Sequence, residues 1–155
     1  MLVKDLMTEP AKTCRVTTLL GDAARIMLDE ECGCLPVIDA RGHLAGMITD
    51  RDICLTVAER HKSPWEIPVR DAMTSKVFAV TPGDHIDAAL VAMKEHRVRR
   101  LPVIDDKGHL KGVLSIDDLV RNTGVARGRL AADAVIDVLR HVCTPKVAPS
   151  EIITA

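Results

Sequence analysis

The chain contains an internal repeat, and this repeat constrains the fold more than any other feature of the sequence. The segment Leu35–Asp39 recurs unchanged as Leu101–Asp105, 66 positions later. Over the 19 positions from 35 to 53, ten are identical to their partners at this offset. The same offset also brings the opening residues of the two copies together: Asp5, Met7 and Thr8 with Asp71, Met73 and Thr74. Such self-similarity predicts two copies of one structural unit.

Each copy shows the same order of secondary-structure signals. Between the anchors the copies shift by two residues, so that a short extended piece ends at Val16-Thr17 in one and at Val80-Thr81 in the other. Residues that start helices follow, Gly21-Asp22 and Gly83-Asp84, and then an apolar pattern with helical spacing. A Leu-Pro-Val-Ile strand, a glycine-containing turn and a second strand predict a hairpin.

A further helix is expected after each hairpin. Thr49 and Ser115 are suitable N-cap residues, each with an aspartate three positions later. The unit therefore has the order β-α-β-β-α, and we expect an α+β fold in which the two repeats pack about a pseudo-two-fold axis. The predicted division is residues 1–60 for the first repeat, 61–69 for a linker, 70–123 for the second repeat and 124–155 for a C-terminal extension.

The extension predicts one more amphipathic helix. Its apolar residues are spaced for one helix face, and Pro145 and Pro149 follow them. The residues that form this face are Leu130, Val135, Ile136, Leu139 and Val142. We interpret the helix as a cap on the core or on a dimer interface rather than as a binder of target peptides.

Charge and composition exclude several classes of protein. Lys and Arg number 21 against 22 Asp and Glu, which gives a formal net charge of −1 and no broad basic face for nucleic acid. The aromatic residues are Trp65 and Phe78, too few for stacking on single-stranded nucleic acid. No apolar run approaches a membrane span, and the charged Lys4-Asp5 pair interrupts any signal peptide. We therefore expect a cytoplasmic protein without nucleic-acid or membrane partners.

Neither metal binding nor catalysis is indicated by a motif. The odd number of cysteines (Cys14, Cys32, Cys34, Cys54 and Cys143) favours reduced thiols packed as small apolar groups. Cys32-Gly33-Cys34 lacks the third and fourth ligands that zinc needs. Nucleophile-elbow, zinc-protease, P-loop and dinucleotide-binding patterns do not occur. The expectation is therefore a protein that is not an enzyme and requires no cofactor.

Two hydroxyl–carboxylate pairs remain, Thr49 with Asp52 and Ser115 with Asp118. A purely structural interpretation is complete in itself, because each pair forms a capping box. A functional interpretation is also open. The free N–H groups of a helix N-terminus attract an anion, and a carboxylate accepts two hydrogen bonds from a sugar diol.

Residues 1 to about 122 resemble tandem cystathionine-β-synthase-type (CBS) domains, known together as a Bateman module. The resemblance rests on the Asp-x-Met-Thr opening, the Leu-Pro-Val-Ile-Asp strand and the ending Gly-h-h-[Ser/Thr]-x-x-Asp, where h is apolar. It implies a regulatory sensor that binds an adenosine-containing ligand in clefts between the repeats and pairs into disc-like homodimers. AMP is the favoured ligand, with ATP, ADP, NAD or S-adenosylmethionine as alternatives. The target protein stays unidentified.

The resemblance also implies the residues of the site. The ribose would lie on Asp52 in one cleft and on Asp118 in the other, with Thr49 and Ser115 near ribose or phosphate. The adenine would lie against the opposite repeat, where core packing is an equally good interpretation for the apolar residues. The positions matched to this second part are Thr13, Cys32, Gly33, Pro36, Val77, Val98, Arg99 and Pro102.

The two clefts are predicted to differ in charge. Arg51 and Arg99 accompany Asp52, and guanidinium groups present paired donors to phosphate oxygens. Asp117 and Gly33 take their places beside Asp118, where a negative charge disfavours phosphate. The run Arg97, Arg99 and Arg100 has an alternative interpretation as a solvated or dimer-facing charge cluster.

Three functions are weighed for the whole chain. The leading hypothesis is the nucleotide sensor. A ligand-independent scaffold that kept the fold is the alternative, and the two intact hydroxyl–carboxylate pairs argue against it. A catalytic role has the least support. We expect a homodimer that buries apolar helix faces containing Met27 and Met93.

Overall fold

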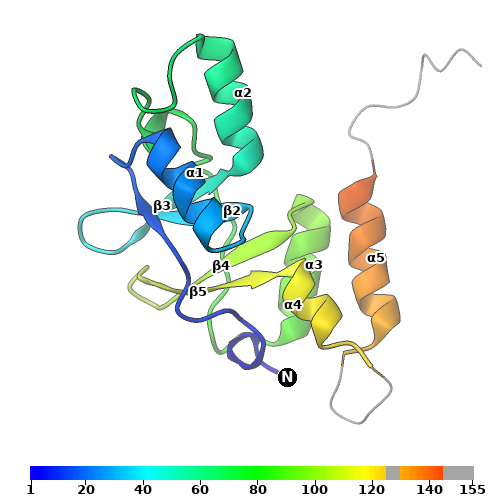
Figure 1. The fold of residues 1–155 in the computed structure, drawn as a ribbon. Helices are drawn as coiled ribbons and strands as arrows, with labels where there is room; N and C mark the ends of the chain where they lie inside the picture. Colours follow the sequence, from blue (N-terminus) through cyan, green and yellow to red (C-terminus); the bar gives the residue numbers. More distant parts are fainter. Residues whose placement is uncertain (125–129, 145–155) are drawn as a thin grey trace, which may run out of the picture.

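The computed structural model of the chain describes residues 1–124 and 130–144. The first repeat consists of β1 (Cys14–Arg15), α1 (Leu20–Asp29), β2 (Cys34–Ile38), β3 (Leu44–Thr49) and α2 (Asp50–Arg60), in the predicted order. β2 lies between β1, to which it is parallel, and β3, to which it is antiparallel. The helices α1 and α2 cover this small sheet (Figure 1).

The second repeat has the same plan. It consists of α3 (Ile86–His96), β4 (Arg100–Ile104), β5 (Leu110–Ser115) and α4 (Ile116–Arg121). The counterpart of β1 is a single parallel bridge between Val80 and Val103. Short 3₁₀ helices, η1 (Val3–Asp5) and η2 (Val69–Asp71), lie at equivalent positions of the two copies. The predicted α+β class and the tandem repeat are both confirmed.

The structure corrects one detail of the repeat, because the offset of 66 holds without interruption. Cys14 pairs with Val37 and Val80 pairs with Val103, and both members of the second pair lie 66 positions after those of the first. The starts of α1 and α3 are also 66 apart. The predicted two-residue shift was therefore wrong. It matched two Val-Thr dipeptides that are not equivalent, because Val80 is buried and pairs with Val103, whereas Val16 lies in the loop after β1.

The expected start of the first helix changes for the same reason. Gly21 lies inside α1, not before it, while Gly83 and Asp84 precede α3. A Cβ atom on Gly21 would come 2.4 Å from the Trp65 ring. The glycine therefore serves close packing of the linker on α1 rather than helix initiation.

The N-terminal segments of the two repeats are exchanged. Val3 is buried in the core of the second repeat, and Ile67 and Val69 are buried in the core of the first. The backbone N–H of Val3 donates to the carbonyl of Asp84 at 2.9 Å, and that of Val69 donates to Thr18 at 2.7 Å. Each hydrophobic core is thus completed by the segment that leads into the other repeat.

The same exchange brings the segment after each Met-Thr pair onto the opposite sheet. Thr8 bridges to Val113 on β5, and Thr74 bridges to Met47 on β3. The hairpin turns also meet, because the His43 and His109 rings stack with centroids 4.6 Å apart. These reciprocal contacts are the pseudo-two-fold packing that the repeat predicts.

The predicted C-terminal helix is present as α5 (Ala132–Cys143) and has no counterpart after the first repeat. It lies beside α3 (Figure 1), and Val135 and Val138 are buried in the core of the second repeat. Lys94 on α3 forms an ion pair with Asp137 on α5. The predicted helix terminators Pro145 and Pro149 lie outside the described residues.

Two methionines do not lie where the homodimer argument placed them. Met27 and Met93 are both buried in their own repeats and form no open apolar face. The apolar residues that do stand open on the first repeat are Leu28 on α1 and Leu55 on α2, with exposures of 77% and 56%. Within the described part of the chain, no helix combines the length and apolarity needed to cross a membrane.

Candidate functional site

The hydroxyl–carboxylate pairs form the same cap at the start of α2 and α4. Thr49 Oγ1 donates to Asp52 Oδ2 at 2.7 Å and accepts from the Asp52 backbone N–H at 3.1 Å. Ser115 Oγ donates to Asp118 Oδ2 at 2.6 Å and accepts from the Asp118 N–H at 3.2 Å. The capping-box interpretation is therefore correct as a description of local structure. Both pairs also line cavities between the repeats.

The first cavity, which we call the Asp52 cleft, has a volume of about 490 Å³. This volume falls within the range of about 300–1,000 Å³ found for small-molecule sites. Arg51 and Asp52 come from the start of α2, whereas Val98 and Arg99 come from the opposite repeat, just before β4. The structure thus brings together six predicted site residues: Thr49, Arg51, Asp52, Val77, Val98 and Arg99.

Cationic side chains dominate the wall of the Asp52 cleft. Five line it against two carboxylates. The cations are Lys76, Arg51, Arg97, Arg99 and Arg100, and the carboxylates are Asp50 and Asp52. Only Arg51 and Arg99 were predicted to bind phosphate in this cleft, whereas Arg97 and Arg100 were considered only as part of a charge cluster and Lys76 was not predicted. This cleft can therefore hold an anionic group next to a hydrogen-bond acceptor.

The second cavity, the Asp118 cleft, has a volume of about 390 Å³. It contains the predicted residues Cys32, Gly33, Pro36, Ser115 and Asp118. Its wall has three cationic side chains and four carboxylates. These are Lys12, Arg100 and Arg121, and Glu30, Glu31, Asp117 and Asp118. The balance of charge is the reverse of that in the Asp52 cleft.

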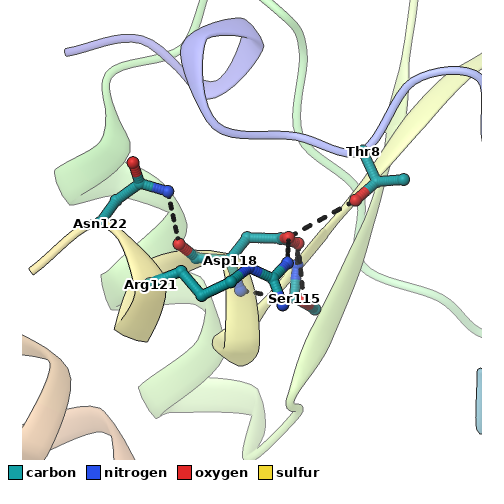
Figure 2. Close-up of polar contacts among 5 residues, drawn as sticks. All are labelled: Thr8, Ser115, Asp118, Arg121 and Asn122. Carbon is teal, nitrogen blue, oxygen red and sulfur yellow. Dashed lines mark hydrogen bonds and ion pairs between the residues drawn. The ribbon is translucent and has the colours of Figure 1, made fainter.

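Asp118 is more enclosed than its counterpart. Its relative exposure is 4%, whereas Asp52 is only partly buried. Figure 2 shows Asp118 between Thr8, whose Oγ1 donates to Oδ1 at 3.4 Å, and Arg121, which forms an ion pair with the same oxygen. Arg121 occupies a carboxylate oxygen that the predicted ribose contact would use. This ion pair was not predicted from the sequence.

The aromatic and charged residues at the cleft rims also differ. In the Asp52 cleft, Phe78 stacks on His96 with ring centroids 3.3 Å apart. At the positions 66 residues earlier, Lys12 forms an ion pair with Glu30 at 2.8 Å in the Asp118 cleft. One rim offers a flat apolar surface, and the other offers a salt bridge.

Arg100 and Cys34 line both cavities and separate them. They are equivalent residues, each at the start of the first strand of a hairpin. Burial raises the pKa of the Cys34 thiol to about 11, although the nearby Arg100 opposes the shift. This thiol is therefore protonated at neutral pH and acts as an apolar wall.

Two predicted site residues lie outside both cavities. Thr13 precedes β1 without lining the Asp118 cleft, and Pro102 is buried in β4 without lining the Asp52 cleft. Thr13 was taken from the segment Lys12–Cys14, which was matched to Ser75–Val77. At the constant offset Val77 corresponds to Ala11, which does line the Asp118 cleft. Within residues 1–124 and 130–144, no three His, Cys, Asp or Glu side chains are arranged to hold a metal ion.

Comparison with known proteins identifies the repeated unit. The family model described as "CBS domain" matches residues 3–59 and 69–123. The CBS domain-containing protein YhcV of Bacillus subtilis is 32% identical over 120 residues, which are 77% of this chain and 84% of YhcV. A homoserine O-acetyltransferase of Methanohalophilus mahii is 32% identical over 124 residues, which are 80% of this chain but only 25% of that enzyme.

Solved structures show the same arrangement with ligands. The CBS domain pair of protein MJ0100, in complex with 5-methylthioadenosine and S-adenosyl-L-methionine, is 27% identical with a TM-score of 0.71. The match covers 78% of this chain and 94% of that one. CBSX2 in complex with AMP is 28% identical with a TM-score of 0.67, and the match covers 77% and 93% of the two chains.

Proposed function

The chain belongs to the CBS domain family, and from that premise we propose that it is a regulatory module that binds AMP in the Asp52 cleft. The observation that carries the proposal is the composition of this cleft. A capped carboxylate, Asp52, lies in the same cavity as the guanidinium groups of Arg51 and Arg99. The carboxylate accepts hydrogen bonds from a ribose diol, and the guanidinium groups donate to a phosphate.

The apolar part of the cleft suits the base. Val77, Val98 and Phe78 line the same cavity from the second repeat, opposite the start of α2. An adenine ring buries apolar surface against such side chains and stacks on an aromatic face. Sugar, phosphate and base therefore each have a matching region within one cavity.

The Asp118 cleft takes a different ligand in this proposal. Its excess of carboxylates disfavours a phosphate, and Arg121 already neutralises Asp118. An adenosine derivative with less negative charge fits this cleft better than AMP. Support comes from MJ0100, whose CBS domain pair binds two adenosine derivatives without phosphate groups.

Two alternatives are weaker. A scaffold without a ligand would not need five cationic side chains around one cavity, since unpaired like charges repel each other. An enzyme is not supported either, because the match to the homoserine O-acetyltransferase covers a quarter of that protein. All five cysteines are free thiols, which favours the cytoplasm as the site of action.

The test is calorimetric titration of the chain with AMP, ADP, ATP, NAD and S-adenosylmethionine, together with adenosine. We expect AMP to bind more tightly than adenosine. At 100 times its dissociation constant it should add about 2.7 kcal/mol to the free energy of unfolding. If none of these compounds binds at millimolar concentration, the scaffold interpretation replaces the sensor.

Self-association is the second part of the proposal. The most exposed apolar side chains of the helices are Leu28 on α1 and Leu55 on α2, at 77% and 56%. In the second repeat α5 packs on α3, and the exposures of Val91 and Val120 are lower, at 51% and 48%. A homodimer formed through the first repeat would bury these leucines. Light scattering should give twice the chain mass at micromolar concentration, and Leu28→Lys should give the mass of a monomer. A wild-type monomer with and without AMP would overturn this part. The protein that receives the signal stays unidentified.

A further inference from the structure

The C-terminal helix α5 contributes to one cleft only. Val142, in its last turn, lines the Asp52 cleft. Among the described residues, none from α5 lines the Asp118 cleft. The helix lies outside both repeats, and the first repeat has no equivalent of it. The Asp52 cleft is therefore bounded in part by a segment that the repeated fold does not supply.

The last turn of α5 also contacts Arg99, the residue that is predicted to bind the phosphate. Arg99 Nη2 lies 3.9 Å from Cys143 Sγ, at the C-terminal end of the helix. A helix C-terminus carries partial negative charge, so a guanidinium group beside it is favourable. Arg99 thus has two possible anionic neighbours, the end of α5 and a phosphate in the cleft.

The rest of α5 is fixed more firmly than its end. Val135 and Val138 are buried, and Asp137 forms the ion pair with Lys94. By contrast, Val142 is only partly buried and Cys143 is exposed. A change at Arg99 will therefore affect the last turn first, while the start and middle of the helix stay packed on α3.

We propose that the last turn of α5 and the phosphate of a nucleotide compete for Arg99, so that filling the Asp52 cleft releases this turn. This inference rests on the proposed function, because it needs a phosphorylated ligand in the Asp52 cleft. Coupling of this kind is reciprocal, and a weaker hold of α5 on Arg99 must raise the affinity for the nucleotide by the same factor. The C-terminal helix becomes the element that reports whether this cleft is occupied.

The test measures backbone amide hydrogen exchange in the full chain. Exchange is followed by mass spectrometry, peptide by peptide, without ligand, with saturating AMP and with saturating adenosine. AMP should raise the exchange rate of the amides in the last turn of α5 about two- to fivefold, the factor expected for losing a cation at a helix end. Adenosine should leave the rate unchanged. The middle of α5, which Val135 and Val138 hold in the second core, serves as the internal reference.

Reciprocity supplies a second measurement. Cys143→Ala should tighten AMP about two- to fivefold and leave adenosine unchanged, while Cys54→Ala, its matched control, changes neither. Calorimetry on the same samples separates the two levels of the argument. If AMP binds but the last-turn amides of α5 exchange at an unchanged or lower rate, the competition is overturned and the sensor stands. If AMP does not bind, both are overturned.

Discussion

The Asp52 and Asp118 clefts share one framework and differ in most of the side chains around it. In each cleft a hydroxyl caps a helix whose aspartate lines the cavity, and an arginine at the shared wall, Arg100, faces both. Around this framework the charges are reversed. Arg99 corresponds to Gly33 at the offset of 66, so the second cleft lacks a guanidinium group at that place.

The difference teaches which residues carry ligand chemistry. The capping pair is constrained by the fold, because it satisfies the first N–H groups of a helix whether or not a ligand is present. The other residues that line the clefts do not cap the start of α2 or α4, and the two repeats differ in sequence at most of these positions. Ligand selectivity is therefore expected to depend on positions such as 33 and 99 rather than on the aspartates.

Asp52→Ala provides the largest expected effect. Two charged hydrogen bonds to a ribose diol are worth about 1.5–3 kcal/mol each, so AMP should bind about 100-fold more weakly or worse. Calorimetry against wild type measures this, and Asp52→Asn is the isosteric control with an intermediate loss. Equal AMP affinity in wild type and Asp52→Ala would leave Asp52 with a capping role only.

Arg99→Ala should act on the phosphate alone. The loss of one charged hydrogen-bond partner weakens AMP by about tenfold or more. Adenosine, which lacks the phosphate, should bind as in wild type. Titrating both ligands into both proteins decides the matter. An equal loss for the two ligands would assign Arg99 to the fold, and no loss for either would place it in solvent.

The reverse substitution sharpens the same comparison. Gly33→Arg would place a guanidinium group in the Asp118 cleft, but a side chain at Gly33 meets Asp50 Oδ2 at 3.2 Å from the new Cβ. The end of a flexible carboxylate can move by the small distance required. We expect AMP to gain a second site of about tenfold higher affinity than the wild-type Asp118 cleft offers. A calorimetric stoichiometry that stays unchanged would contradict the charge argument.

The caps should differ in what they contribute to stability. Asp118 is buried and also pairs with Thr8 and Arg121, whereas Asp52 is only partly buried. Asp118→Ala should therefore lower the free energy of unfolding by about 1–2 kcal/mol, the upper part of the range for lost N-caps. Asp52→Ala should cost less. Urea unfolding of both variants measures the two values, and a larger cost for Asp52→Ala would reverse this ranking.

The smallest effect concerns the hairpin turns. Hydrogen bonds to the Asp105 carboxylate lower its pKa from 3.8 to about 2. The backbone N–H of His109 has the largest effect, and the side chain of Lys111 lowers the pKa further. The pKa of Asp39 is also lowered, chiefly by the backbone N–H of His43. A lowered pKa in the folded state means that stability is present above pH 3.8 and is lost as the pH falls through about 2.

Replacing these aspartates should make the free energy of unfolding depend less on pH in the acid range. We expect Asp105→Asn to remove more of the acid dependence than Asp39→Asn, because the side chain of Lys111 bonds the Asp105 carboxylate and, among the described residues, no lysine or arginine side chain bonds the Asp39 carboxylate. Urea unfolding at several pH values between 5 and 2 gives both slopes. Identical slopes for the two variants would show that Lys111 contributes nothing.

Much of the fold could be predicted because each structural signal occurs in both copies of the repeat. The Leu-Pro-Val-Ile strands, the turns and the caps at Thr49 and Ser115 each appear in two copies, and agreement between copies fixes them. The surface loop before α1 has no such support. There a chance match of Val16-Thr17 to Val80-Thr81 displaced the alignment by two residues.

Two of the missed site residues share a physical reason. Phe78 and Val142 line the Asp52 cleft from segments that only the packing of the repeats brings close. Arg121 is different, because it lies three positions after Asp118 on α4, a spacing at which charged side chains of a helix pair. It corresponds to Leu55, so comparing the two copies did not point to this ion pair. Val142 belongs to a helix outside the repeat, whose apolar pattern predicts a buried face but not the cavity that the face reaches.

The exchange of N-terminal segments bears on how the chain is made. A ribosome releases Val3 long before the second core into which it packs, and the first core needs Ile67 and Val69 before it can close. The nascent first repeat therefore exposes its apolar N-terminal segment, which contains Val3, until the second repeat has been synthesised. A gene fragment that ends before the linker encodes neither core in full, so the pair, and not the single repeat, is the smallest unit that synthesis can deliver as a folded product.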